Sequence, residues 1–197
     1  MKKNKKGFLI WVTGLSGSGK SLLAIKIKKN LEKKNINSIL VNGDDLRKIF
    51  NLNKFDKKSR LRYAKSYSMF CKQITDQGTN VIIATIAMFE DVRKWNRKNI
   101  KNYYEIYLKT SYKLIKKRNK KKLYLSKINN VIGKDIKPEL PKKPDFIFKN
   151  NFKNNSQLNA KLFLKILFFK LILENLMFTP SSALAPINSE FSMRTSF

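Results

Sequence analysis

One short segment constrains the fold of this chain more than any other part of its sequence. Residues 14–21 read GLSGSGKS and match the pattern G-x-x-x-x-G-K-S/T at every fixed position. An apolar, β-rich run at 8–12 precedes the segment and a stretch with helical periodicity at 21–34 follows it, as the pattern requires. The glycines let the backbone curl so that its N–H groups point at phosphate oxygens, and the helix N-terminus adds partial positive charge. The sequence therefore predicts a loop that binds a nucleoside triphosphate.

Two side chains of this loop have expected roles in binding ATP. Lys20 reaches the β- and γ-phosphates, and Ser21 offers its hydroxyl to Mg²⁺. The motif alone does not separate kinases from GTPases or motor ATPases, but 197 residues without a second domain suit a small-molecule kinase. The residues of the motif that are predicted to bind ATP are Gly14, Leu15, Ser16, Gly17, Ser18, Gly19, Lys20 and Ser21.

A second polar segment, NGDDLR at 42–47, follows the strand expected at 38–41. Because ligands bind beyond the carboxyl ends of parallel strands, this segment is expected to face the same crevice as the phosphate-binding loop. Asp44 would accept a proton from an attacking hydroxyl or hold Mg²⁺ through water, and Arg47 would clamp an anionic substrate. The alternative is structural: an Asn-Gly turn, with Asp45 capping a short helix and Arg47 in solvent.

The remaining pattern predicts an α/β fold. Strand-like runs alternate with helical segments, which is typical of a parallel sheet. The fold class is therefore the three-layer type of P-loop NTPases, a central parallel sheet flanked by helices. Residues 1–178 are predicted to form one domain, and 179–197 a disordered tail. The expected strands are 8–12, 38–41, 81–87, 103–108 and 145–148, and the expected helices are 21–34, 45–50, 57–77, 90–99, 112–120 and 157–178.

The composition narrows the chemistry. The chain has no His and one Cys, which excludes a His-based catalytic or metal site and an internal disulfide. Its net charge of +30 suggests an anionic partner, with nucleic acid as the first guess. Most of its 43 basic residues are Lys spread along the chain, whereas nucleic-acid readers concentrate Arg. This favours a basic surface that is simply exposed to solvent. The alternative to an enzyme is a nucleic-acid-binding protein that uses this charge.

No apolar segment predicts a membrane span. The run at 8–12 is shorter than the roughly 7 residues that a signal-peptide core needs, and no uncharged apolar stretch reaches about 18 residues. We therefore expect a cytoplasmic protein. The expected helix at 157–178 is very apolar from 162 onward, which leaves a membrane-surface anchor as an alternative to packing in the core or in a dimer contact.

The two phosphate-facing segments together resemble the adenylyl-sulfate kinases. In that family a loop similar to GLSGSGKS is followed by D-G-D-x-x-R, which NGDDLR matches except at Asn42. The resemblance covers about residues 7–178 and includes the Pro144–Asp145 pair before the last expected strand. It implies a P-loop kinase that transfers the γ-phosphate of ATP to the ribose 3′-hydroxyl of adenylyl sulfate, with Mg²⁺ and often as a homodimer.

The same resemblance implies roles for individual residues. Asp44 would be the base or the carboxylate that organises the metal ion. Arg118 would lie near the adenine and phosphates of ATP, and residues 121–143 would form a lid over both nucleotides. The residues implied in binding the acceptor are Asp44, Arg47, Phe55, Arg60, Tyr63 and Lys65.

The chain departs from the family's pattern around the acceptor. Tyr63 and Lys65 stand where the family has Asn and Arg in an E-N-I-R-R stretch, and Ala87 aligns with the serine of I-S-P-Y. Residues 130–133, NVIG, replace the aromatic-bearing G-F-T-G of the lid. The transfer residues are kept while the acceptor pocket is altered, which implies a related nucleotide such as cytidine diphosphoramidate, the substrate of a relative in bacterial capsule synthesis. A genuine adenylyl-sulfate kinase of sulfate assimilation is the alternative.

Overall fold

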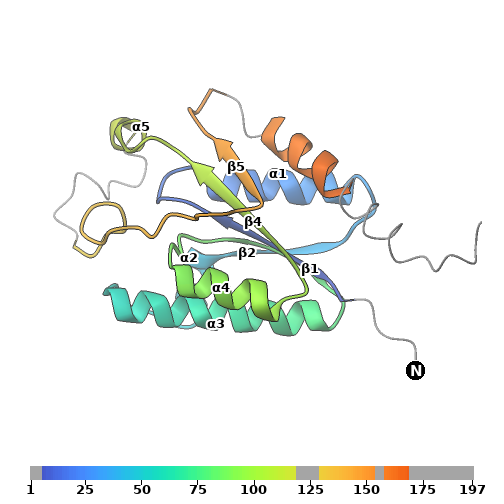
Figure 1. Cartoon of the computed structure of the whole chain (residues 1–197), viewed down its shortest axis with the longest axis horizontal. Helices are drawn as coiled ribbons and strands as arrows, with labels where there is room; N and C mark the ends of the chain where they lie inside the picture. Colours follow the sequence, from blue (N-terminus) through green and yellow to red (C-terminus); the bar gives the residue numbers. More distant parts are fainter. Residues whose placement is uncertain (1–5, 119–128, 154–157, 169–197) are drawn as a thin grey trace, which may run out of the picture. The chain divides into compact units, whose positions relative to one another are not determined.

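The computed structural model describes residues 6–118, 129–153 and 158–168 (Figure 1). Its contacts divide the chain into two units, Met1–Leu164 and Lys165–Phe197, and the first unit contains the whole sheet. Residues 158–168 are helical, while the rest of the helix expected at 157–178 and the expected tail lie outside the described residues. The domain boundary at 178 stays a prediction. In the described part of the chain no helix combines the length and apolarity that crossing a bilayer requires.

Five parallel strands form one sheet in the order β2-β3-β1-β4-β5. The connection from β1 passes β3 to reach β2 on one side of the sheet, and the connection from β3 passes β1 to reach β4 on the other side. The direction of the connections therefore reverses between the neighbouring strands β1 and β3. In open parallel sheets the ligand binds at such a reversal, beyond the carboxyl ends of the strands. The strands are β1 Phe8–Thr13, β2 Ser38–Asn42, β3 Asn80–Ala84, β4 Asn102–Lys109 and β5 Phe146–Lys149.

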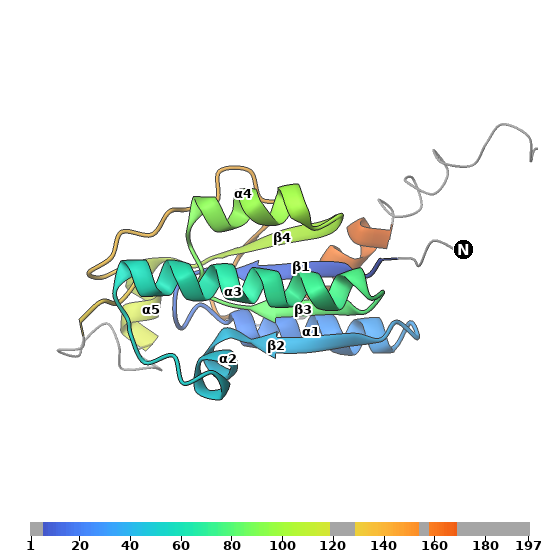
Figure 2. The same cartoon turned by 90° about the horizontal axis from the view of Figure 1, so that it is seen from below.

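Helices cover both faces of the sheet, which confirms the three-layer fold class. In Figures 1 and 2, α3 and α4 lie together on one face and α1 lies on the other. Because successive side chains of a strand point to opposite faces, Leu9 and Trp11 pack into the cluster with α3 and α4, while Ile10 and Val12 face α1. The helices are α1 Lys20–Glu32, α2 Gly43–Ile49, α3 Lys57–Asp76, α4 Glu90–Asn99 and α5 Tyr112–Arg118.

Two local expectations are wrong. Asp45 does not cap α2: the helix begins at Gly43, and the Asp45 carboxylate accepts a hydrogen bond from Asn42 Nδ2 at 3.1 Å instead. Strand β3 ends at Ala84 and does not continue to Ala87. Beyond Ala84, the Thr85 N–H still donates to the Val12 carbonyl at 3.0 Å, but the Ile86 carbonyl accepts from the Thr13 side-chain hydroxyl at 2.8 Å.

A buried ion network ties α4 to β4 and to the segment before β5. The Glu105 side chain on β4 is only 2% exposed and accepts a hydrogen bond from Arg97 Nη2 at 2.8 Å. Arg93 is 3% exposed, lies 3.6 Å from Glu105 through its Nε, and donates from Nη2 to Glu90 at 2.6 Å. Asp145 accepts hydrogen bonds from Arg97 and from the Glu105 backbone. Burial raises the pKa of Glu105 to about 7, against the opposing effects of the two arginines.

Removal of the Glu105 carboxylate should destabilise the fold strongly. In Glu105→Ala the buried Arg93 loses one of its carboxylate partners, so we expect the free energy of unfolding to fall by about 3 kcal/mol. The measurement is urea unfolding followed by circular dichroism at pH 8, where the wild-type carboxylate is ionised. The control is Glu32→Ala, which removes a surface ion pair with Lys28 and should cost at most about 0.5 kcal/mol. Equal losses in the two variants would contradict this account of the buried network.

Candidate active site

The phosphate-binding loop connects β1 to α1, as the sequence predicts. Gly14 has a φ of 150°, and a Cβ there would lie 2.7 Å from the Leu108 carbonyl oxygen, so the close approach of the loop to β4 requires glycine. Lys20 is the first residue of α1 and is 8% exposed. Its ammonium donates to the Leu15 carbonyl at 2.8 Å, which holds the charge inside the curve of the loop. A phosphate that enters this curve meets backbone N–H groups and the Lys20 ammonium together.

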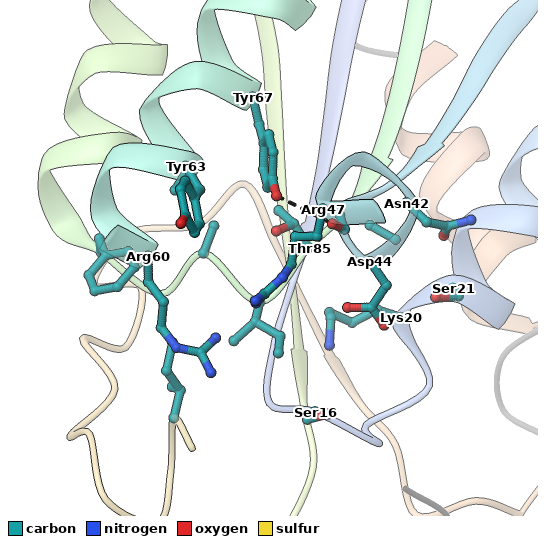
Figure 3. Close-up of a pocket in the computed structure, with 17 residues that line it drawn as sticks. Ser16, Lys20, Ser21, Asn42, Asp44, Arg47, Arg60, Tyr63, Tyr67 and Thr85 are labelled. Atoms are coloured by element: carbon teal, nitrogen blue, oxygen red, sulfur yellow. Dashed lines mark hydrogen bonds between the residues drawn. The ribbon is translucent and has the colours of Figure 1, made fainter. Parts of the chain in front are cut away.

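A pocket opens beyond the carboxyl ends of β1, β2 and β3, where the sheet order predicts a ligand. In Figure 3, Lys20 and Asp44 lie toward one end of this pocket and Arg60 and Tyr63 toward the other. The residues predicted from the sequence that line it are Ser16, Lys20, Ser21, Asp44, Arg47, Arg60 and Tyr63. The other lining residues are Asn42, Gly43, Ala64, Tyr67, Ala84, Thr85, Ile86, Ala87, Phe89 and Ile132.

Two arginines supply the positive charge at the acceptor end. Arg47 lies on α2 with its guanidinium carbon 3.9 Å from the centre of the Phe55 ring, and Arg60 on α3 lies 5.2 Å from the same centre. Arg60 also donates to the backbone carbonyls of Phe55 at 2.6 Å and Asn130 at 2.8 Å. Burial and the charge of Arg47 lower the pKa of Arg60, while Asp44 raises it. Phe55 is exposed and outside the pocket lining, yet it holds the two cations that line the pocket.

Aromatic and apolar side chains form the other wall. Tyr63 and Tyr67 are buried on α3, and the Tyr67 hydroxyl lies 3.4 Å from the Gly43 carbonyl that precedes Asp44. Burial raises the pKa of Tyr67 to about 12, so its hydroxyl stays protonated near neutral pH. A pocket with cations on one side and flat rings on another suits a substrate that has both an anionic and an aromatic part.

Sequence reasoning missed several lining residues. Thr85 and Phe89 follow β3 on either side of Ala87, which the family resemblance had already placed at the acceptor, and the rule that ligands gather at strand ends was sufficient to select this segment. Ile132 comes from a different part of the chain and is buried in the main cluster beside the pocket. The family resemblance had placed residues 130–133 in the lid, but nothing in the local sequence pattern distinguishes Ile132 from other apolar residues.

Beside Phe55 and five residues of the phosphate-binding loop (Gly14, Leu15, Gly17, Ser18 and Gly19), two more predicted site residues are absent from the pocket lining. Lys65 is exposed on α3 and does not line it. Arg118 ends α5, with its guanidinium 4.3 Å from the centre of the Phe152 ring. Residues 121–128 of the lid expected at 121–143 lie outside the described residues, which resume at 129. The roles given to these residues therefore stay predictions.

A further short pattern in the sequence has a local structural use. Residues 53–56 read NKFD and match N-K-x-D, the pattern by which GTPases recognise guanine. Here Asp56 is the N-cap of α3: its carboxylate accepts a hydrogen bond from the Ser59 backbone at 2.9 Å, and that bond lowers the pKa of Asp56. Asn53 donates to Asn51 at 2.6 Å. Both polar groups are used within the loop, so the match does not indicate guanine recognition.

The oxygen donors at the transfer end of the pocket suit Mg²⁺. Ser21 and Asp44 are exposed and line the same pocket as Lys20. Mg²⁺ prefers oxygen ligands and is commonly held by one or two carboxylates together with water and substrate phosphates. Within the described ranges, no three His, Cys, Asp or Glu side chains gather into a metal cage. The donor set therefore fits an ion that arrives with a nucleotide.

Comparison with known proteins agrees with this geometry. The family described as adenylylsulphate kinase matches residues 6–149. The chain is 37% identical over 169 residues to the cytidine diphosphoramidate kinase of Campylobacter jejuni, which covers 84% of this chain and 98% of the relative. It is 30% identical over 170 residues to the adenylyl-sulfate kinase of Buchnera aphidicola, with 82% of each protein covered.

Solved structures agree with the sequence matches. The APS kinase of Mycobacterium tuberculosis, in complex with AMPPNP and APS, is similar with a TM-score of 0.76 and 26% identity, covering 82% of this chain and 98% of that chain. A shikimate kinase from Aquifex aeolicus, with a TM-score of 0.54, 17% identity and coverage of 84% of this chain and 99% of its own, shares the fold alone. The family match spans the phosphate-binding loop, the Asp44 segment and all five strands. This chain is a kinase that belongs to the adenylylsulphate kinase family.

Proposed function

We propose that this kinase transfers the γ-phosphate of ATP to the ribose 3′-hydroxyl of a nucleotide other than adenylyl sulfate, and that cytidine diphosphoramidate is the favoured acceptor. The observation that carries the proposal is the pocket itself. It joins Lys20 and Asp44 to two arginines, beside a wall altered at Tyr63 and Ala87. The higher identity to the cytidine diphosphoramidate kinase than to the adenylyl-sulfate kinase supports the same acceptor. A homodimer and a cytoplasmic location remain further predictions.

The proposed transfer is in line and requires little covalent chemistry from the protein. The acceptor oxygen forms a bond to the γ-phosphorus while the bond from that phosphorus to the β–γ bridging oxygen breaks, and ADP leaves. Asp44 orients the acceptor hydroxyl and takes its proton, and Lys20 stabilises the charge on the transferring group. Mg²⁺, held by Ser21 and Asp44, neutralises charge on the β- and γ-phosphates when it is bound.

Different side chains at the acceptor end of the pocket bind the anionic part and the base of the acceptor. Arg47 and Arg60 present guanidinium groups, which bind phosphate or phosphoramidate oxygens through paired hydrogen bonds. Phe55 holds both groups, so they are partly ordered before the acceptor binds. The ring of Tyr63 replaces the smaller Asn of the family's pattern, which narrows the space for a base and favours a pyrimidine over a purine.

An acceptor panel tests this assignment. The full-length protein is incubated with ATP, Mg²⁺ and one acceptor at a time, and 3′-phosphorylated products are detected by mass spectrometry. We expect kcat/KM for cytidine diphosphoramidate to exceed that for adenylyl sulfate by at least about tenfold, because the altered wall admits the smaller base at a gain of about 1.4 kcal/mol. Cytidine diphosphate is the matched control for the amidate group. Preference for adenylyl sulfate would sink the acceptor assignment and leave ATP binding intact.

A further inference from the structure

The residue that follows β5 reaches back to the phosphate-binding loop. Asn150 Nδ2 donates to the Ser18 carbonyl oxygen at 2.7 Å, although 132 positions separate the two residues. The Thr110 hydroxyl lies 3.4 Å from the same oxygen. The Asn150 backbone N–H donates to Lys109 at 2.9 Å, beside the last paired residues of β4 and β5. The backbone of Asn150 is therefore held in place at the end of the sheet.

This hydrogen bond orients a peptide group of the loop. The Ser18–Gly19 peptide is planar and trans, so the Ser18 carbonyl and the Gly19 N–H point in opposite directions. Because Asn150 holds the carbonyl on its own side of the loop, the Gly19 N–H is turned toward the other side. That N–H belongs to the turn at the N-terminus of α1, where backbone donors bind phosphate.

The close approach of Asn150 also explains one glycine of the motif. Gly19 has a φ of 99°, and a Cβ there would lie 2.8 Å from Asn150 Nδ2. Glycine is therefore needed both for the left-handed backbone and for the space that the Asn150 amide occupies.

The opposite end of the Asn150 amide is used as well. Its Oδ1 accepts a hydrogen bond from the Phe152 backbone at 2.9 Å, which orders the turn after β5. The Phe152 ring in turn contacts the Arg118 guanidinium. With one end of its amide on the loop and the other on this turn, the Asn150 side chain has a single orientation that satisfies both contacts.

We propose that Asn150 is a positioning residue for the ATP triphosphate. It acts through Ser18 and Gly19 and does not touch the transferring group. By holding the Ser18 peptide before ATP arrives, it lowers the ordering cost of the loop on binding. The proposal concerns the phosphate-binding loop alone and does not depend on which nucleotide accepts the phosphate.

Two variants separate the hydrogen bonds of Asn150. Asn150→Asp keeps the shape and the acceptor for the Phe152 N–H but has no donor for Ser18 at neutral pH. Asn150→Ala removes both bonds. The control is Asn151→Ala, because Asn151 is the exposed neighbour of Asn150 and its side chain accepts a hydrogen bond from the Lys153 backbone at 3.0 Å.

Calorimetric titration with ATP and with inorganic tripolyphosphate provides the readout. We expect both Kd values to rise about tenfold in Asn150→Ala and at least as much in Asn150→Asp, while Asn151→Ala stays within about twofold of wild type. Tripolyphosphate has no base, so a loss with this probe does not arise from contacts with adenine, and in Asn150→Asp, which keeps the bond to Phe152, the loss comes through the loop. Unchanged tripolyphosphate binding in Asn150→Asp, or an equal loss in Asn151→Ala, would overturn the proposal. The acceptor KM should stay unchanged, which a general loss of structure would not allow.

Discussion

We expect Lys20→Ala to lower kcat/KM by at least about a thousandfold, which corresponds to about 4 kcal/mol of lost transition-state stabilisation. The reason is geometric. The Lys20 ammonium lies inside the curve of the loop, 2.8 Å from the Leu15 carbonyl, where it meets the β- and γ-phosphates of a bound nucleotide. Its charge stabilises the transferring phosphoryl group in a site where it is mostly shielded from water. Release of ADP, followed at saturating acceptor, measures the effect.

The control for Lys20→Ala is Lys29→Ala, which removes an exposed lysine from the same helix. This variant should keep the wild-type rate, because the net charge changes equally in both while only Lys20 lines the pocket. Retention of more than a tenth of the wild-type kcat/KM by Lys20→Ala would contradict the role given to the loop. A thousandfold loss in both variants would instead point to the overall charge of the protein.

The second large effect is expected at Asp44. Asp44→Asn keeps the size of the side chain but removes its charge and its ability to take a proton, so we expect kcat to fall by about 10²- to 10⁴-fold. Asp45→Asn is a matched control, because Asp45 is the adjacent exposed carboxylate on α2 and bonds to Asn42. It should change kcat by less than about twofold. An unchanged rate in Asp44→Asn would show that the assigned role is wrong.

Titration with Mg²⁺ separates the two roles proposed for Asp44. If its main role is to organise the ion, Asp44→Asn should need a higher Mg²⁺ concentration for half-maximal rate, and saturating Mg²⁺ should restore part of kcat. If it acts mainly as the base, the loss in kcat should persist at every Mg²⁺ concentration. In either case ATP binding without Mg²⁺ should match the wild type, because Lys20 and the loop are unchanged.

The transfer end of the site was predictable because its chemistry is contained in short runs of sequence. Residues 14–21 carry the loop, the lysine and the hydroxyl in consecutive positions, and Asp44 lies two positions after the next strand. A pattern of this kind needs only the correct strand–loop–helix context, which apolar periodicity supplies. The same periodicity predicted all five strands, and it overran β3 because the residues after Ala84 are as apolar as the strand itself.

The acceptor end was predictable only in part. Arg47 followed from its position after the second strand, but Arg60 came only from a family resemblance, and the sequence contained no sign that Phe55 would hold both guanidinium groups. Ile132 reaches the pocket from a distant segment. The net charge of +30 was a poor guide as well, since among the described Lys and Arg residues only Lys20, Arg47 and Arg60 line the pocket.

By itself, the sequence determined that this chain builds a parallel α/β sheet with a triphosphate loop at the end of its first strand. Only the tertiary structure decided what surrounds that loop: the pair of arginines on one aromatic ring, the buried Glu105 network, and the bond from Asn150 to Ser18. The physical reason is the separation along the sequence of the residues that make contact. Periodicity and motifs record contacts between residues a few positions apart, whereas a bond across 132 positions exists only after β4 and β5 have paired and brought its two ends together.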